Sequence, residues 1–410
     1  MNDKSDKLLS VDEARERVLA GARPRDIERV ALAEAQGRTL ADDLAARRTQ
    51  PPSAVSAMDG YALRAADAAD LPARLRRIGE SAAGHGFAGA IGPGETVRIF
   101  TGAPVPAGAD AVLMQEYAKA DGDMVEALVA VRQGASIRAA GLDFREGQVL
   151  LKAGTRLGPA EVSLAAAMNH AGVPVYRKPK VAILATGDEL VRPGEAIGPD
   201  QIVTSNSFAI AAFVRLAGGE PLDLGIAGDT FADLDAGIKA ARDAGADVLV
   251  TLGGASVGDY DLVKPALAKE GMELGFWRIA MRPGKPLIHG RLGAMQILGL
   301  PGNPVSSVVC GLLFLIPLVR ALSGDPQAGA DMSEPARLGG ALRGNDVRQD
   351  FMRARLAPSQ DGLPVATAFA EQDSSLLGVL AQAQCLIIRA PHAPPVEAGA
   401  LVRILRLPTG

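Results

Sequence analysis

The most constraining feature of this 410-residue sequence is an alternation of two hydrophobic patterns between Lys180 and about Leu322. Short aliphatic runs of strand length, beginning with residues 181–185, alternate there with amphipathic stretches of helical period. Strands that alternate with helices predict a mainly parallel sheet that helices cover on both faces. Ligands of such sheets gather beyond the carboxyl ends of the strands, so functional residues are expected at the strand ends.

The turn after the strand predicted at residues 247–251 carries the most suggestive chemistry. It contains Gly253, Gly254, Ser256, Gly258 and Asp259. Glycines let the backbone approach a bulky ligand, and free N–H groups at a strand-to-helix turn suit phosphate oxygens. An aspartate beside a phosphate requires a cation between the two, so the turn also implies a hard metal such as Mg²⁺. A tight turn with an aspartate helix cap would have the same composition, and the rest of the chain must decide.

Further strand ends share this acidic character. Glu189, Asp229 and Asp259 each follow a predicted strand, and the loop at residues 301–304 follows another. Three independent acidic strand ends indicate a common site rather than solvated surface. Lys285 lies in a loop that prolines stiffen, and it would supply a phosphate contact. This mixture of acidic and basic residues near glycine turns predicts a phosphorylated ligand bound through a divalent ion.

The flanking regions have a different texture. Glycines punctuate short apolar runs from about residue 77 to 117, which predicts a small β-rich domain. Residues 159–171 are predicted to form a helix that Gly172 closes. Residues 330–410 are predicted to form a small separate β domain, because short alternating strands follow one another there.

Composition excludes several classes of function. A formal net charge of −4 gives no reason to expect nucleic acid or an anionic membrane as a partner. The chain has no Walker P-loop, and a serine hydrolase is not expected because histidines are few. Cys310 and Cys385 lack zinc spacing and are predicted to be buried thiols, which are typical of a reducing compartment. The start of the chain is polar, and the apolar segment 305–319 is predicted to be a core helix, so we expect a cytoplasmic protein.

Six short motifs occur in order at residues 56–62, 100–104, 186–190, 253–261, 282–286 and 300–306. Together they resemble the molybdopterin molybdenumtransferase family, which includes the gephyrin E domain. The resemblance implies an elongated multidomain subunit that forms a homodimer. It implies a central mainly parallel α/β sandwich that binds molybdopterin, a β-rich N-terminal insert and a small C-terminal β-barrel-like domain. The predicted parts are residues 1–177, a helical dimerisation region with the insert at about 55–145; residues 178–328, the central domain; and residues 329–410, the C-terminal β domain.

The activity implied by this resemblance is the insertion of molybdate into adenylylated molybdopterin, with release of AMP and a dependence on Mg²⁺. The upstream adenylyltransferase and the recipient molybdoenzymes are further expected partners. The resemblance assigns catalytic roles to Asp59, Thr101, Asp143, Glu189, Asp229 and Asp259, with Glu189 and Asp259 at the metal. It assigns substrate binding to Thr186, Gly187, Asp188, Gly253, Gly254, Ser256, Gly258, Arg282, Lys285, Pro301, Pro304, Arg353 and Ser374. Asp59, Thr101 and Asp143 would reach the site across the dimer interface.

The sequence departs from the family pattern at Leu142, Thr204, Leu252 and Asp373. Two alternatives to the transferase remain at this point. One is the adenylyltransferase step just upstream, which uses the same kind of central domain; the motifs around Asp59 and Thr101 argue against it. The other is a non-enzymatic scaffold of the gephyrin type; the intact acidic strand ends argue against that.

Overall fold

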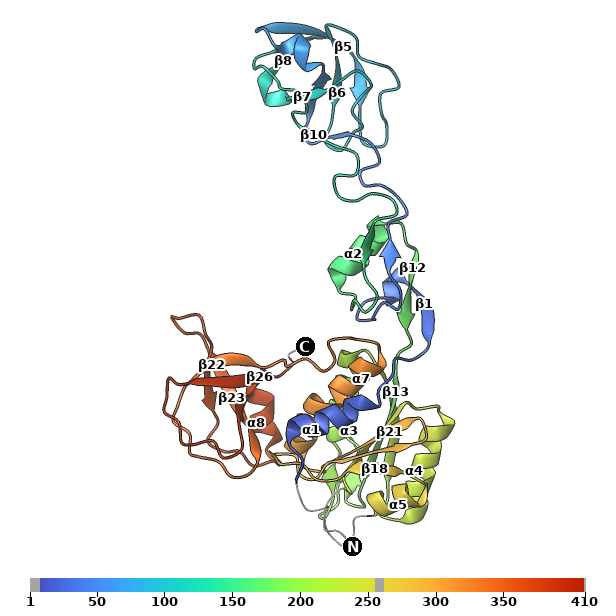
Figure 1. Ribbon diagram of the computed structural model, residues 1–410, viewed down its shortest axis with the longest axis vertical. Coiled ribbons are helices and arrows are strands. Elements are labelled where there is room, and N and C mark those ends of the chain that lie inside the picture. The colour runs from blue at the N-terminus through green and yellow to red at the C-terminus, as the bar shows by residue number, and fades with distance from the viewer. Residues whose placement is uncertain (1–7, 255–261, 409–410) are drawn as a thin grey trace.

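The computed structural model describes residues 8–254 and 262–408. The chain is elongated, with a β-rich part at one end and a small mixed part in the middle (Figure 1). The central sheet and a C-terminal β structure lie side by side at the other end. Ser256, Gly258 and Asp259, three of the predicted site residues, lie outside the described residues.

The predicted central sheet is confirmed as a six-stranded sheet that is mainly parallel. Its strand order is β16 (Glu220–Ala227), β13 (Lys180–Thr186), β17 (Val248–Leu252), β21 (Met295–Leu300), β20 (Ile288–Leu292) and β18 (Glu273–Phe276). The first four strands are parallel, and β20 and β18 are antiparallel to their neighbours. The parallel strands therefore end at the same edge of the sheet, as ligand binding at strand ends requires.

Helices cover both faces of this sheet. One face packs on α3 (Asn206–Ala217) and on a helix that runs from α6 (Pro304–Cys310) to α7 (Ile316–Leu322), and the other packs on α4 (Phe231–Asp243) and α5 (Val263–Lys269). Val181 and Ile183 of β13 face the first layer, whereas Ala182 and Leu184 face the second. This continuous apolar run is the expected pattern for a strand that is buried on both faces.

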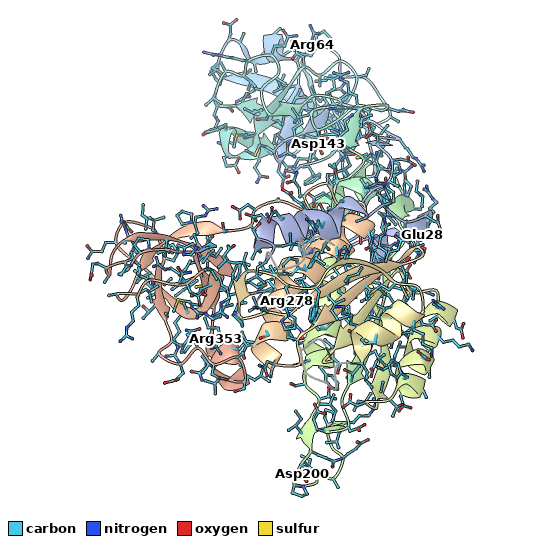
Figure 2. All side chains as sticks on the ribbon, turned by 60° about the horizontal axis from the view of Figure 1, so that its bottom comes forward. Glu28, Arg64, Asp143, Asp200, Arg278 and Arg353 are labelled. Atoms are coloured by element: carbon cyan, nitrogen blue, oxygen red, sulfur yellow. The ribbon has the colours of Figure 1, made fainter. Side chains whose placement is uncertain are left out.

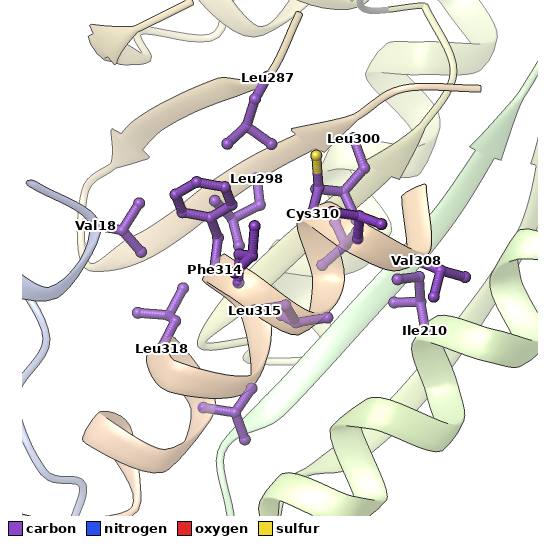
Figure 3. Close-up of a cluster of buried hydrophobic side chains, with 14 of the residues drawn as sticks. Val18, Ile210, Leu287, Leu298, Leu300, Val308, Cys310, Phe314, Leu315 and Leu318 are labelled. Carbon is purple, nitrogen blue, oxygen red and sulfur yellow. The ribbon is translucent and has the colours of Figure 1, made fainter. Parts of the chain in front are cut away.

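The stretch Pro304–Leu322 forms the predicted core helix. By length and composition it could cross a membrane, but 72% of its most apolar window is buried inside the protein. Figure 3 shows Cys310, Phe314 and Leu318 of this helix packed among side chains of the neighbouring elements. A five-residue π-helical segment, Gly311–Leu315, joins α6 to α7. Cys310 and Cys385 are both free and buried, as predicted.

The chain leaves and re-enters the central part through an arm, residues 27–176. Before the arm, helix α1 (Val11–Ala20) packs into the central hydrophobic cluster. The base of the arm pairs β1 (Ile27–Ala31) with β12 (Gly172–Tyr176) and carries α2 (Pro159–Ala167). The prediction that this helix reaches residue 171 was wrong. The helix ends at Ala167, Asn169 takes a φ of +71°, and Gly172 begins β12 instead of closing the helix.

Two further six-stranded sheets complete the fold. The tip of the arm has the order β7 (Ala111–Met114), β4 (Gly60–Leu63), β6 (Glu95–Ile99), β5 (Ala73–Ser81), β9 (Met124–Ala127) and β8 (Ala118–Asp121). The C-terminal sheet has the order β19 (Met281–Arg282), β23 (Gln349–Ala357), β24 (Val365–Ala368), β22 (Glu334–Leu338), β26 (Leu401–Arg406) and β25 (Cys385–Arg389). Because β25 also pairs with β23, five of these strands close into the predicted barrel. The exact domain boundaries stay predictions.

Candidate functional site

The glycine turns at the carboxyl ends of the parallel strands lie next to one another. Gly187, after β13, donates its N–H to the carbonyl of Ala227 at the end of β16, at 3.1 Å. Gly253, after β17, donates its N–H to the carbonyl of Leu300 at the end of β21, also at 3.1 Å. These hydrogen bonds tie neighbouring strand ends together in pairs. The predicted gathering of these turns at one edge of the sheet is therefore present.

Two carboxylates face each other at this edge. Asp229 donates its backbone N–H to Asp188 Oδ1 at 3.0 Å, and Asp188 donates its N–H to Asp229 Oδ2 at 3.4 Å. The carboxylate of Glu189, on the same turn, folds against Gly187. The two adjacent turns thus present three acidic side chains, and backbone hydrogen bonds hold two of them, Asp188 and Asp229. Such a cluster favours a cation or a ligand that brings one.

Thr186 and the double glycine form one compact unit. Thr186 is 4% exposed, and its hydroxyl donates to the carbonyl of Leu252 at 3.4 Å. Gly253 and Gly254 have φ values of +102° and +57°, and a Cβ on Gly253 would lie 2.7 Å from the carbonyl oxygen of Thr186. Glycine is therefore required at position 253 by both conformation and space. The buried Thr186 therefore packs against the turn that follows β17 and holds it in place.

The C-terminal barrel contacts this edge through Ser374, whose role in substrate binding stays a prediction. The side-chain amide of Asn303 donates to Ser374 Oγ at 2.9 Å, and the N–H of Val305 donates to the Ser374 carbonyl at 3.0 Å. Asn206 donates to the carbonyl of Gly302 at 2.7 Å. Pro301 and Pro304 flank this loop, with Pro301 buried and Pro304 partly buried. The sequence motifs gave no role to Asn206 or Asn303, yet the side-chain amides of both hold this loop.

The predicted basic residues have three different environments. Arg282 donates from Nε and Nη2 to the two carboxylate oxygens of Asp350, at 2.9 and 2.6 Å, and these bonds raise the pKa of Arg282. Arg353 is 1% exposed and donates to Gln372 Oε1 at 3.3 Å and to the carbonyls of Glu371 and Leu376.

Arg353 therefore supports the loop that carries Ser374, and its contact with substrate stays a prediction. Burial lowers the pKa of Arg353. Lys285 is exposed and has no ion pair within residues 8–254 and 262–408. Of the three predicted cations, Lys285 is thus the one that is open to a ligand phosphate.

Asp59 and Thr101 form a second, separate acidic group at the tip of the arm. Thr101 donates from its backbone N–H and its hydroxyl to Asp59 Oδ1, at 2.7 and 2.8 Å. These bonds, the backbone one first, lower the pKa of Asp59. Arg98 lies beside them and stacks over Tyr61, with 5.1 Å from its guanidinium carbon to the ring centroid. The predicted pair is therefore in direct contact.

Within one chain, this pair lies far from the strand-end site. Asp59 adjoins β4 and Thr101 follows β6, and both strands belong to the end of the molecule opposite the central sheet (Figure 1). Asp143 lies in a loop where the tip of the arm meets its base, and its N–H donates to the carbonyl of Gln50 at 3.0 Å (Figure 2). A single chain does not bring Asp59, Thr101 and Asp143 to the glycine turns.

Three family models match this chain along most of its length. Residues 9–169 match the MoeA N-terminal region, comprising domains I and II. Residues 182–321 match the probable molybdopterin binding domain, and residues 335–407 match the MoeA C-terminal region, domain IV.

Full-length relatives give the same result. The chain is 36% identical to a molybdopterin molybdenumtransferase from Nostoc over 391 residues, which cover 94% of this chain and 89% of the relative. It is 34% identical to the protein of that name from Haemophilus influenzae, over 97% of this chain and 98% of the relative. Its fold superposes on the molybdopterin biosynthesis MoeA protein of Pyrococcus horikoshii with a TM-score of 0.81 at 30% identity, covering 98% of this chain and all of that one.

Proposed function

We propose a reaction for this chain from one premise: it belongs to the molybdopterin molybdenumtransferase (MoeA) family. It is accordingly an enzyme of molybdenum cofactor biosynthesis that acts on molybdopterin. More specifically, we propose that it inserts molybdate into adenylylated molybdopterin and releases AMP. The matches to the MoeA regions on both sides of the central domain favour this reaction over the adenylyltransferase and scaffold alternatives.

The observation that carries the proposal is the strand-end site. The glycine turns stand beside Asp188, Asp229 and Glu189, and Lys285 is an exposed cation in a loop that prolines stiffen. Glycine turns at the ends of parallel strands suit a bulky phosphorylated ligand. Acidic groups alone would repel its phosphates, so the combination favours a ligand that binds together with a divalent cation.

The chemistry of the donors fits Mg²⁺. No group of three metal-binding side chains is preassembled among the described residues. Mg²⁺ does not require such a group, because it commonly takes one or two carboxylates and completes its shell with water and substrate phosphates. Glu189 would supply one carboxylate. Asp259, the second predicted ligand, lies outside the described residues. A bound Mg²⁺ would neutralise the charge that develops on the phosphoanhydride.

The remaining steps fall to side chains of the protein. Gly187, Gly253 and Gly254 would let the backbone approach the pterin and its phosphates. Lys285 would pair with a phosphate oxygen while a water oxygen attacks phosphorus in the phosphoanhydride, so that a new P–O bond forms as the P–O bond to AMP breaks and AMP leaves. Ser374, fixed by Asn303, would close the opposite side of the site. The rate gain in this proposal comes from orientation and from fixed charges that need no rearrangement during the reaction.

We further propose that the complete site forms in a homodimer. Asp59, Thr101 and Asp143 lie on the arm, away from the strand-end site of their own chain (Figure 1). A second chain, placed antiparallel to the first, would bring its arm residues to that site. A carboxylate whose low pKa keeps it charged, such as Asp59, could then act on the bound substrate and its cation. Cytoplasmic location and delivery to molybdoenzymes are parts of the same proposal.

The direct test is to incubate the purified protein with adenylylated molybdopterin, Mg²⁺ and molybdate, and to follow AMP. Release that needs both the metal and molybdate supports the transferase. Consumption of ATP with molybdopterin would instead support the adenylyltransferase, and tight binding without release would support a scaffold. Mixing Asp59→Asn chains with Asp229→Asn chains tests the shared site, because mixed dimers should regain activity that neither variant has alone.

A further inference from the structure

The base of the arm is held by one buried carboxylate at the end of the sheet away from the site. Asp247 directly precedes β17 and is 7% exposed. Its Oδ2 accepts the backbone N–H of Lys180 at 2.8 Å. The double glycine follows the other end of β17, so about 16 Å of extended strand separates Asp247 from the predicted chemistry. Asp247 therefore cannot contact the same substrate as those glycines.

Asp247 joins both chain segments that connect the arm to the central part. Arg177, on the returning segment, donates from Nη1 and Nη2 to its two oxygens at 3.1 and 3.0 Å. Arg25, on the departing segment, places Nε 3.1 Å from Oδ1. Arg177 also donates its backbone N–H to the carbonyl of Asp26 at 2.7 Å, which links the two segments directly. The Asp247 carboxylate thus contacts both of the chain segments that connect the arm to the central part.

A second buried carboxylate holds the other side of the base. Asp325, which is 6% exposed, accepts a hydrogen bond from Arg320 Nε at 2.7 Å. Arg156, from the arm, lies 3.8 Å from the same carboxylate and donates to the carbonyl of Leu216 at 2.8 Å. The arm is therefore fixed to the central part by ionic contacts on two sides. The bidentate pair between Arg177 and the buried Asp247 restricts orientation more than an exposed surface pair does.

We propose that Asp247 is a positioning residue for the reaction, which fixes the direction of the arm and so the place of Asp59, Thr101 and Asp143 in the shared site. This inference rests on the proposed function, because the arm residues matter only if they act at the site of a second chain. A small rotation at the base moves the distant tip of the arm by a much larger distance. Misplacement of a reacting group by about 1 Å can cost about 100-fold in rate.

The orientation of the arm can be measured independently of activity. Both native cysteines are buried, and burial raises the pKa of Cys385 to about 12, so introduced exposed cysteines will react selectively. Ser163→Cys on α2 and Lys239→Cys on α4 place one spin label on the arm and one on the central part. Electron paramagnetic resonance then gives the distance distribution, with labelled chains diluted in unlabelled ones so that only distances within a chain are recorded.

The test compares Asp247→Asn with a matched control, Asp235→Asn. Asp235 also loses an ion pair, with Lys269 at 2.6 Å, but that pair lies within the central domain between α4 and α5. We expect Asp247→Asn to shift or broaden the distance distribution and to slow AMP release by about 10- to 100-fold. The control should leave both quantities at the wild-type values.

An unchanged distance distribution in Asp247→Asn overturns the proposal, as does a changed distribution with wild-type AMP release. Arg177→Gln removes the Arg177–Asp247 pair from the arginine side. If Asp247→Asn does not fold, the same two measurements on Arg177→Gln decide whether the pair orients the arm. If the wild-type protein itself releases no AMP, the proposed function fails. The distance comparison then still shows whether Asp247 holds the arm, so the two failures are distinguishable.

Discussion

Replacement of Gly253 by alanine should disrupt the site, whereas the same replacement at Gly302 should not. Gly253 has a φ of +102°, and an added Cβ would lie 2.7 Å from the carbonyl oxygen of Thr186 and 3.0 Å from its hydroxyl. Gly302, in the adjacent loop, is not among the residues with positive φ, and the nearest heavy atom to its added Cβ would be 3.7 Å away. The two glycines share one region of the site and differ in backbone conformation and in what a methyl group would meet.

The magnitude follows from these two conflicts. A non-glycine residue in such a conformation costs about 1 to 3 kcal/mol. Relief of the backbone contact requires movement of β13 or of the turn, so we expect about 2 to 4 kcal/mol in total against the competent turn conformation. Since each 1.36 kcal/mol corresponds to a factor of ten, Gly253→Ala should lower kcat/KM for AMP release by at least about 30-fold.

The assay follows AMP release over a range of substrate concentrations, together with circular dichroism to verify that the sheet is intact. Gly302→Ala is the control, and it should stay within about twofold of the wild type. If Gly253→Ala matched Gly302→Ala in kcat/KM, then the strained glycine turn would not be part of the substrate site. The assignment of Gly254 to substrate binding would lose its support as well, because Gly254 lies on the same turn.

Three further predictions follow from other contacts. Asp350→Ala removes the bidentate partner of Arg282. A double-mutant cycle with Arg282→Ala should show a coupling of about 1 kcal/mol in kcat/KM, and additive effects of the two substitutions would contradict a role of the Arg282–Asp350 pair in the reaction. Thr101→Val removes a hydroxyl bond that lowers the pKa of Asp59, so this pKa should rise toward its ordinary value. The carboxylate would then protonate at higher pH, and the acid limb of kcat/KM should move upward in pH; an unmoved limb would exclude Asp59 as the titrating group. Chelation should abolish AMP release and Mg²⁺ should restore it, with Glu189→Gln requiring more Mg²⁺; an unchanged Mg²⁺ requirement would exclude Glu189 as a metal ligand.

Local sequence patterns were sufficient to predict the central fold. The strands are short runs rich in β-branched residues, and the helices have apolar residues at the helical period. Each element is therefore specified by its own residues. The end of α2 was predicted incorrectly because Gly172 looked like a helix terminator. Gly172 instead pairs with Ala31 across the β1–β12 pair, and a Cβ on Gly172 would lie 2.6 Å from the Val30 carbonyl oxygen. That pairing joins residues more than a hundred positions apart, which no local pattern reveals.

The same limit applies to the site. The resemblance assigns Arg282 to substrate binding, which stays a prediction, and its sequence context did not indicate that its guanidinium binds Asp350, 68 positions away. Asn303 occupies the N-cap position of α6, yet its side-chain amide donates to Ser374, 71 positions away, instead of capping the helix. Residue type and loop context predict which groups are polar and well placed. They do not predict which of those groups already have a partner in the fold.

The partners that the site residues already have within one chain bear on how the proposed dimer would work. Asp59 is held by two bonds from Thr101, and Asp188 and Asp229 are held by each other's backbone, so both halves of the site are ordered before they meet. Preorganised halves gain little from adjustment on contact, and their effect depends on the accuracy with which they are brought together. That accuracy is set where the arm joins the central part. The ion pairs of Asp247 and Asp325 should therefore influence the reaction although they lie outside the site, and a stabilising change elsewhere in the arm should not replace them.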